Sequence, residues 1–337
     1  MTTDATTTRA GANAVDLEFT NVSKQYGSLT VVNNLSFKVP AGQICVLVGP
    51  SGCGKTTSLK MVNRLVEPSS GQILVGGKDV TAQDPIELRR GIGYVIQQVG
   101  LLPHLTVGDN VATVPRLLGW ETARVKERSD ELIESVGLDP SRYRDRFPAQ
   151  LSGGERQRVG VARALAVDPP LMLMDEPFGA VDPIVRERLQ NELLRLQERL
   201  AKTIVFVTHD IDEAIKMGDL VAVMQVGGVL AQFGPPSQIL ANPASDFVAQ
   251  FVGADRGLKR LSLARVSDLD TQPVTAEHQP QPGQPLLQQR TTLKDALSQM
   301  LESDVSTGVI VDESGRPVGV ITVDQIAAVL RGGAGQA

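Results

Sequence analysis

Short, almost continuous apolar runs alternate with amphipathic segments between residues 15 and 255. The apolar runs have the length and composition of strands that are buried on both faces of a sheet. The amphipathic segments have the period of helices, and 182–200 is the longest of them. This alternation predicts an α/β domain with a mainly parallel sheet over residues 15–255. Its expected elements include strands at 43–48, 92–96, 171–174 and 203–207 and helices at 55–65, 156–167 and 182–200.

The pattern changes after residue 253. A basic stretch at 256–265 precedes 271–289, where four prolines and six glutamines occur among nineteen residues, and we interpret 256–290 as a linker. Order returns at 291–331 and predicts a small α+β module. Its expected elements are a helix at 292–301, strands at 307–311 and 317–322, and a helix at 323–330. The expected flexible tails are residues 1–14 and 332–337.

Composition narrows the class of protein. The 337 residues include 33 basic and 38 acidic ones, and the formal net charge of −5 argues against a protein that coats nucleic acid. With 42% hydrophobic residues, the chain can bury a sizeable core. Cys45 and Cys53 fit neither a disulfide framework nor a metal cluster, so a reducing cytosol is favoured. No run approaches the roughly 18 apolar residues that span a bilayer, so we expect any membrane role to depend on partners.

A glycine-rich loop follows the first predicted buried strand. It reads Gly49-Pro50-Ser51-Gly52-Cys53-Gly54-Lys55-Thr56, which is the pattern of a phosphate-binding loop before a helix. Glycines let backbone N–H groups surround phosphate oxygens, and the helix N-terminus adds partial positive charge. We expect Lys55 to reach the β- and γ-phosphates and the Thr56 hydroxyl to ligate Mg²⁺. The predicted nucleotide-binding residues here are Gly49, Pro50, Ser51, Gly52, Cys53, Gly54, Lys55, Thr56 and Thr57.

Two adjacent carboxylates end the predicted strand at 171–174. Asp175 lies where a buried carboxylate needs a cation or hydrogen bonds, and we expect it to support Mg²⁺. Glu176 follows at the exit of the strand, and we expect it to be the general base that polarises the attacking water. Alone, such a pair would more often be a surface feature. Downstream of a phosphate loop, it predicts a site of nucleotide hydrolysis.

Between the phosphate loop and these carboxylates lies a heptad that reads Leu151-Ser152-Gly153-Gly154-Glu155-Arg156-Gln157. This order of motifs resembles the ATP-binding-cassette (ABC) ATPases. The resemblance implies a P-loop ABC ATPase domain with a mainly parallel sheet, an antiparallel β part and a helical subdomain. It also implies a homodimer in which this element of one chain, at a helix N-terminus, caps the ATP of the other. The implied contact residues are Ser152, Gly153, Gly154 and Gln157.

The same resemblance implies roles for four further residues. Tyr26 matches the aromatic residue that stacks on adenine, and Asp182 matches the aspartate of the loop that crosses the dimer interface. Gln97 resembles the glutamine that senses the γ-phosphate, with Gln98 as the neighbouring alternative. His209 resembles the switch histidine that contacts the γ-phosphate and holds the attacking water. The implied catalytic set is Glu176, His209, Gln97 and Lys55, and the implied metal set is Thr56, Gln97 and Asp175.

ABC ATPases serve several processes, and this sequence favours an importer. A fused membrane segment, a second phosphate loop and a long coiled-coil insertion would indicate exporters, translation factors and DNA-repair members, and the sequence has none of them. Residues 93–107 closely resemble the ATPase subunit of bacterial importers of quaternary amines, such as glycine betaine, proline betaine, carnitine and choline. Two alternatives stay open: an importer of another small polar solute such as an amino acid, and a soluble regulatory ATPase without a permease.

Segments within 292–322 resemble one cystathionine-β-synthase-type (CBS) repeat. A cassette followed by such repeats is typical of the quaternary-amine group, which often has two of them. Here one residue separates Thr322 from Asp324, whereas nucleotide-binding repeats usually have two residues there, and this spacing disfavours adenine-nucleotide binding by the module. We expect the single repeat to pair with its copy in the dimer.

The sequence thus predicts the ATP-hydrolysing subunit of a binding-protein-dependent importer of quaternary-amine osmoprotectants. The implied cofactors are ATP and Mg²⁺. The implied partners are a second copy of the chain, integral-membrane permease subunits and, indirectly, an extracytoplasmic substrate-binding protein, with no nucleic acid. The implied location is the cytoplasmic face of the cell membrane, where the chain would be a peripheral subunit.

Overall fold

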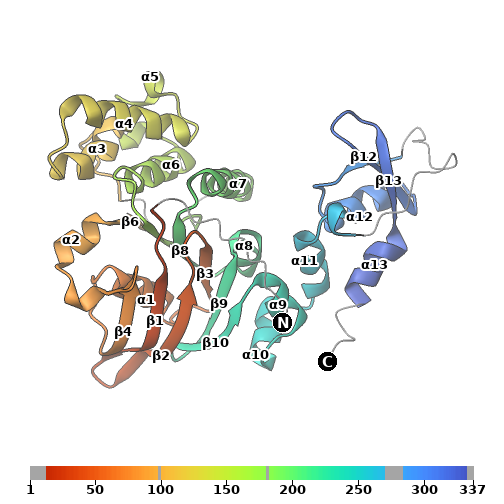
Figure 1. Cartoon of the computed structure of the whole chain (residues 1–337), viewed down its shortest axis with the longest axis horizontal. Coiled ribbons are helices and arrows are strands. Elements are labelled where there is room, and N and C mark those ends of the chain that lie inside the picture. The colour runs from red at the N-terminus through yellow and green to blue at the C-terminus, as the bar shows by residue number, and fades with distance from the viewer. Residues whose placement is uncertain (1–12, 98–99, 180–181, 270–283, 332–337) are drawn as a thin grey trace. The chain divides into compact units, whose positions relative to one another are not determined.

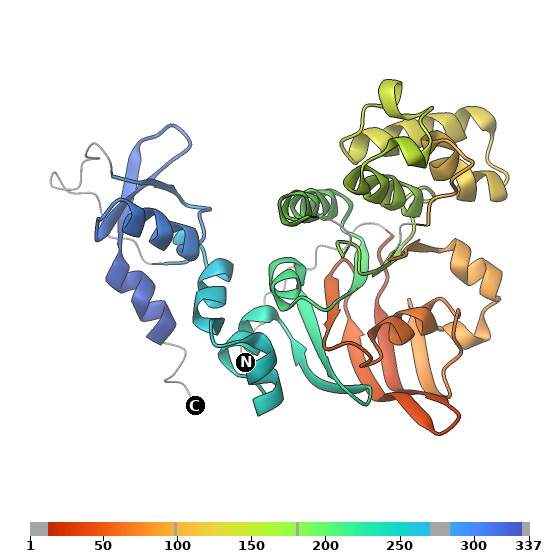
Figure 2. The ribbon, with the colours of Figure 1, turned by 180° about the vertical axis from the view of Figure 1, so that it is seen from behind.

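The computed structural model describes residues 13–97, 100–179, 182–269 and 284–331, and the expected tails lie almost entirely outside them. The chain falls into two compact units, residues 1–233 and residues 234–337. Figures 1 and 2 show the elements of each unit from opposite sides. In the part of the chain that the structure describes, no helix is long and apolar enough to cross a membrane.

The first unit is organised around a six-stranded sheet with the order β10-β9-β3-β8-β7-β6. The strand pairs from β9 through β6 are all parallel. Every residue of β3, β7 and β8 is buried, which confirms the strands expected from the three apolar runs. The strand bounds are Ile44–Val48 (β3), Ile92–Val95 (β6), Leu171–Asp175 (β7), Thr203–Thr208 (β8), Leu220–Gln225 (β9) and Val229–Gly234 (β10).

A second sheet is antiparallel and has the order β2-β1-β4-β5. A tight turn at Gly27, whose φ is 59°, joins β1 to β2. Phe19 and Phe37 stack across these strands with ring centroids 4.6 Å apart, and they share a core with Leu47 and Leu173 of the parallel sheet. This common core holds the two sheets together. The bounds are Leu17–Tyr26 (β1), Leu29–Val39 (β2), Ser70–Val75 (β4) and Lys78–Asp79 (β5).

Helices α3 to α6 form a helical subdomain beyond one end of the parallel strands (Figure 1), in which α3, α4 and α6 pack against one another. Helix α6 begins three residues earlier than expected, because Ser152 and Glu155 form a capping box at its start. Helix α1 ends at Val62 rather than at 65, because Arg64 has a left-handed φ of 54°. The helix bounds are Lys55–Val62 (α1), Pro85–Arg90 (α2), Val107–Leu117 (α3), Thr122–Ser135 (α4), Pro140–Tyr143 (α5), Gly153–Ala164 (α6), Pro183–Leu200 (α7) and Ile211–Met217 (α8).

The second unit contains three helices, α9 to α11, followed by the α+β module. The module's two helices and two strands lie within one residue of their expected bounds, and a short strand, β11, pairs in parallel with β12. A buried cluster that includes Leu293, Ile310 and Ile326 forms its core. The bounds are Pro236–Ala241 (α9), Asp246–Val252 (α10), Arg256–Leu263 (α11), Leu286–Gln288 (β11), Leu293–Glu302 (α12), Thr307–Val311 (β12), Pro317–Thr322 (β13) and Val323–Arg331 (α13).

The linker expected at 256–290 is wrong for its first part. Residues 256–263 form α11, and Leu261 and Val266 are fully buried in the core of the module. The apolar residues of this basic stretch fall on one face of a helix, which the composition alone did not reveal. Because α11 also packs against α9, the two units divide after Phe233 and not at the expected boundary at 255.

Candidate nucleotide site

The loop between β3 and α1 passes close to neighbouring backbone. Gly54, at the N-cap of α1, has a φ of 93°, and a Cβ there would lie 2.5 Å from the Val31 carbonyl oxygen of β2. At Gly49, a Cβ would lie 2.2 Å from the Met224 carbonyl oxygen of β9. Among the described residues, no side chain caps α1, so its first backbone N–H groups can bind an anion. The predicted phosphate loop therefore has the glycine-dependent packing and helix N-terminus that anion binding requires.

Lys55 and Thr56 begin α1 and face this loop. Lys55 is buried, and its Nζ donates hydrogen bonds to the carbonyl oxygens of Gly49 and Pro50 at 2.7 and 2.9 Å. The Thr56 hydroxyl donates a hydrogen bond to Oδ1 of Asp175 at 2.8 Å. Because β3 and β7 are parallel and both flank β8, their carboxyl ends meet at one edge of the sheet. The structure thereby brings together two residues of the predicted metal set, Thr56 and Asp175.

The environment of Asp175 suits a cation. Burial raises the pKa of its carboxyl group above the ordinary value, and the hydrogen bond from Thr56 opposes this shift. A hydroxyl beside a carboxylate is an oxygen donor set of the kind that Mg²⁺ prefers. The described residues contain no cluster of three or more His, Cys, Asp or Glu side chains that could hold a metal, so phosphates and water would supply the other ligands.

Glu176 lies directly after β7 and is held by three groups. Its backbone N–H donates a hydrogen bond to the Val207 carbonyl oxygen at 3.0 Å. Its Oε2 accepts a hydrogen bond from Nε2 of Gln97 at 2.8 Å, and its Oε1 lies 3.5 Å from Nδ1 of His209. The structure thus brings together three of the four predicted catalytic residues, Gln97, Glu176 and His209. They come from the carboxyl ends of three parallel strands, β6, β7 and β8.

Behind His209 lies a polar group that the sequence did not single out. Glu213 of α8 accepts a hydrogen bond from the Thr208 hydroxyl at 2.6 Å, and its other oxygen lies 3.7 Å from Nε of Arg186. Burial raises the pKa of the Glu213 carboxyl group. Since Thr208 ends β8 immediately before His209, these contacts fix the backbone that carries the histidine. The signal in the sequence was slight: a glutamate four residues after His209, one turn into a short helix.

Tyr26 ends β1 at its turn into β2. Half of its side chain is exposed (50%), and the Lys24 ammonium group lies 4.9 Å from the centre of its ring. Strand β2 touches the phosphate loop at Val31, so the hairpin lies beside the nucleotide-binding loop. An exposed aromatic face in this position can stack on a base, and stacking on adenine stays a prediction.

Ser152 and Asp182 lie at the N-caps of α6 and α7. Each is exposed and caps a helix: Ser152 accepts a backbone hydrogen bond at the start of α6 at 3.3 Å, and Asp182 does so at the start of α7 at 3.1 Å. Among the described residues, no hydrogen bond or ion pair joins either side chain to the group around Glu176. Their contacts with a second copy of the chain stay predictions. Residues 98, 180 and 181, which flank the predicted sensing glutamine and crossing aspartate, lie outside the described residues.

Gln157 lies inside its own chain. It is only 4% exposed and lines a pocket between α6 and α7, away from the exposed end of α6 that Ser152 occupies. Gly154 is also buried, and a Cβ there would lie 2.9 Å from Cγ1 of Val185, so α6 and α7 pack closely at this point. For these two residues the structure shows packing within the chain, and their contact with a partner's nucleotide stays a prediction.

Comparison with known proteins shows which protein family the chain resembles. The family described as "ABC transporter" matches residues 32–179, and the one described as "CBS domain" matches 266–332. The chain is 48% identical over 300 residues to the osmoprotectant import ATP-binding protein OsmV of Salmonella typhimurium, which covers 89% of this chain and 76% of OsmV. The choline transport ATP-binding protein OpuBA of Bacillus subtilis is 47% identical over 314 residues (92% and 79%). The glycine betaine uptake system ATP-binding protein YehX of Escherichia coli is 45% identical over 306 residues (90% and 97%).

The chain belongs to the ABC transporter family. A solved dimeric ATP-binding cassette in a post-hydrolysis state, bound to ADP and Pi, resembles this ABC ATPase with a TM-score of 0.58 at 32% identity, over 65% of this chain and 98% of that one. The structure of cbiO1 from Clostridium perfringens, part of an ABC transporter complex, gives a TM-score of 0.62 at 26% identity, over 68% and 91%. The fold class expected from the sequence, an ABC ATPase domain with a small CBS-like module, is confirmed.

The geometry of this ABC ATPase suits ATP hydrolysis. Glu176 can accept a proton from the attacking water, because hydrogen bonding by Gln97 fixes one of its oxygens and leaves the other beside His209. Lys55 supplies a fixed positive charge at the phosphate loop. When bound, Mg²⁺ would neutralise phosphate charge, and Thr56 with Asp175 are the residues that would hold it.

Proposed function

We propose that this ABC ATPase energises a binding-protein-dependent importer of quaternary-amine osmoprotectants, such as glycine betaine, choline or carnitine. The observation that carries the proposal is similarity to OsmV, OpuBA and YehX over 89–92% of the chain. Each of those proteins is named for the transport of an osmoprotectant or of a quaternary amine. In such a transporter the solute contacts other subunits, so the solute itself must be identified by experiment.

The proposed active species is a homodimer with two ATP molecules between the copies. The N–H groups at the start of α6, next to Ser152, would receive the γ-phosphate bound by the other chain. The solved cassette that this chain resembles is itself dimeric. Binding of ATP closes the two copies, and hydrolysis at Glu176 with loss of phosphate opens them. Closure and opening would drive the membrane subunits between their outward-open and inward-open states.

Transport also requires partners that this chain does not supply. The proposed ones are integral-membrane permease subunits and an extracytoplasmic binding protein that delivers the solute. The segment 93–107, whose last residue begins α3, would receive a coupling helix of the permease. Ile96 and Leu102 in this segment expose 37% and 36% of their area, and they offer apolar contacts for such a helix. The ATPase would then lie on the cytoplasmic face of the membrane as a peripheral subunit.

The test is ATP hydrolysis by the complex reconstituted with its permease and binding protein. Glycine betaine, choline and carnitine are compared with a panel of amino acids at equal concentrations. Stimulation by one or more quaternary amines, and by no amino acid, is the expected result. Stimulation by an amino acid alone would overturn the proposed substrate class and leave the transport function intact.

A soluble regulatory ATPase would differ in its partner. The proposal predicts that the tagged chain co-purifies from detergent-solubilised membranes with an integral-membrane protein, and that the pair survives a wash at high salt. Recovery of the chain only from the soluble fraction, with no membrane protein attached, would contradict the transport function itself.

A further inference from the structure

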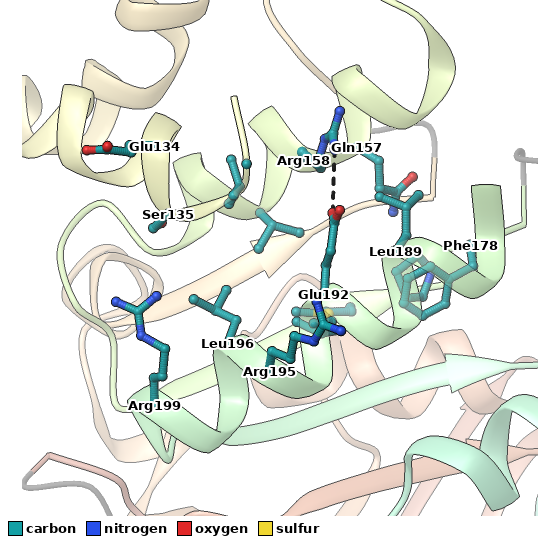
Figure 3. Close-up of a pocket in the computed structure, with 16 residues that line it drawn as sticks. Glu134, Ser135, Gln157, Arg158, Phe178, Leu189, Glu192, Arg195, Leu196 and Arg199 are labelled. Atoms are coloured by element: carbon teal, nitrogen blue, oxygen red, sulfur yellow. Dashed lines mark hydrogen bonds and ion pairs between the residues drawn. The ribbon is translucent and has the colours of Figure 1, made fainter. Parts of the chain in front are cut away.

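A pocket of about 260 Å³ lies within the first unit, and no residue of the phosphate loop lines it. Its walls come from the end of α4, from α6, from the segment after β7 and from α7 (Figure 3). The floor is apolar, and neither the mechanism nor the family assignment uses it. Its main apolar lining residues are Val136, Val161, Phe178, Leu189, Leu193 and Leu196.

The rim of this pocket has more arginine than acidic side chains, so part of its positive charge is not neutralised by an ion pair between described residues. Arg158 and Glu192 face each other at 3.5 Å across it (Figure 3), and Glu192 is also 3.2 Å from Arg188 outside the lining. Arg195 and Arg199 project from exposed positions of α7 along the same rim, and within the described ranges neither forms an ion pair. The other acidic lining residue, Glu134, is exposed at the opposite edge.

The side chain of Arg158, which lines the pocket, has one donor without an acceptor within the described chain. Its Nε is buried, and in the part of the chain that the structure describes it has no hydrogen-bond partner. A buried donor without an acceptor is unfavourable, but this Nε has almost no accessible surface, so a ligand would be recognised by the rest of the pocket. The combination of an apolar floor and an arginine rim matches a small molecule with an apolar body and an anionic head.

We propose that this pocket is a binding site for a small organic anion with an apolar body, of the class of medium-chain carboxylates. The volume lies a little below the roughly 300–1,000 Å³ of typical small-molecule sites, which restricts the ligand to a short chain or a single ring. The carboxylate would meet Arg195 and Arg199 at the rim, and the hydrocarbon would cover the side chains of α6 and α7.

The position of the pocket connects it to both halves of the nucleotide site. Helix α6 begins at Ser152, which the proposed dimer presents to the partner's ATP, and Gln157 and Val161 of this helix line the pocket. Pro177 and Phe178 line it from the other side and directly follow Glu176. A bound anion would therefore contact α6 and the segment that follows the general base at the same time.

The test is isothermal titration calorimetry of the full chain, without nucleotide, against sodium octanoate. Saturable binding of one octanoate per chain is expected, and hexanoate should bind weaker by about fourfold for each methylene removed. Octylammonium, with the same chain and the opposite charge, should bind at least tenfold more weakly than octanoate. Equal affinity for the two octyl compounds, or no saturable binding of octanoate, would overturn the proposal.

Variants locate the site. Combining Arg195→Ala with Arg199→Ala should weaken octanoate binding at least tenfold, and Val161→Phe, which fills the floor, should abolish it. The matched control is Arg90→Ala, because Arg90 lies on α2, outside the pocket, and its loss should leave octanoate affinity unchanged. Circular dichroism checks that Val161→Phe folds; if it does not, the double arginine variant decides alone. Wild-type affinity in the double variant would overturn the assignment of the anion to this rim.

Discussion

At the scale of single residues, Glu176 has an unfavourable backbone conformation that its hydrogen bonds hold in place. Its φ of 45° lies in the left-handed region, which costs a residue with a Cβ on the order of 1–3 kcal/mol. The hydrogen bonds to Val207 and from Gln97 hold it there. The carboxylate is therefore oriented by its own chain, in the way that a general base requires before the nucleotide arrives.

Replacing Glu176 should separate binding from turnover. Glu176→Gln keeps the shape and the hydrogen bond to position 97 but removes the base, so we expect ATP binding to persist while hydrolysis falls by about 10²–10⁴-fold. Because opening depends on hydrolysis, the variant should elute as a dimer in gel filtration with Mg-ATP. Glu198→Gln, at an exposed position of α7, is the matched control and should behave as wild type. A Glu176→Gln variant that stays monomeric and hydrolyses ATP at a near wild-type rate would disprove the role of this residue.

Glu213 should give stability a specific dependence on pH. Burial raises its pKa in the folded state above the ordinary 4.5, so its contribution is fully present below pH 4.5 and is lost as pH rises through the folded value. Glu213→Gln has the same shape and cannot ionise. We therefore expect the free energy of unfolding of the variant, relative to wild type, to increase as pH rises above 4.5. Urea unfolding across a pH series measures this, and parallel profiles for the two proteins would count against a buried, ionising Glu213.

At the scale of elements, helix α6 presents Ser152 at its exposed N-terminus. Ser152→Arg should leave nucleotide binding by the monomer nearly intact and block hydrolysis, because it places bulk and charge where the partner's γ-phosphate must dock. A fluorescent-nucleotide titration and an ATPase assay measure the two effects. Ser141→Arg, at an exposed serine of α5 in the same subdomain, should affect neither. Loss of monomer binding in Ser152→Arg would instead place Ser152 in its own chain's pocket.

The sequence predicted fully buried strands better than it predicted the other elements. Strands β3, β7 and β8 are apolar throughout because both of their faces are covered, and the phosphate loop is defined by its glycines. By contrast, the sequence predicted a linker where α11 lies. The segment is rich in basic residues, and its buried residue Leu261 becomes apparent only from its packing in the core of the module.

Side-chain placement was predicted less completely than the strands. Local motifs identified Gln97, Glu176 and His209, since each follows a strand end. The contacts of Glu213 and the inward position of Gln157 depend on how α6, α7 and α8 pack. Packing between helices cannot be predicted from the sequence of any single segment.

At the scale of the whole molecule, the single CBS-like module should pair with its copy. Leu301 on α12 exposes 64% of its area, so it is available for contact with a second copy of the module. Leu301→Glu should weaken self-association of the full chain by roughly 10–100-fold, which corresponds to one lost apolar contact. Sedimentation velocity with Mg-ATP, under which the two copies also meet through the nucleotide site, measures the change. Leu117→Glu, at an equally exposed leucine of α3, is the control, and equal association of both variants would argue against pairing through α12.

The module should also connect transport to ionic strength. Its charged residues interact across a screening length of about 8–10 Å at physiological salt, so pairing of two modules would vary with salt. Truncation after Gly253 removes α11 and the whole module, and we expect it to abolish the salt dependence of transport in reconstituted vesicles while transport continues. A chain that ends at Arg331 is the control and should keep that dependence. An unchanged salt profile in the shorter chain would leave the module as a passive clamp between the two copies.

The most direct test of the account is uptake of labelled glycine betaine into vesicles that contain this ATPase, its permease and its binding protein, with ATP enclosed on the side of the ATPase. The account predicts accumulation that requires ATP, stops with a non-hydrolysable analogue and is absent in Glu176→Gln. Choline and carnitine are measured in the same way. Accumulation that persists in Glu176→Gln, or ATP hydrolysis that continues with no uptake of any quaternary amine, would contradict it.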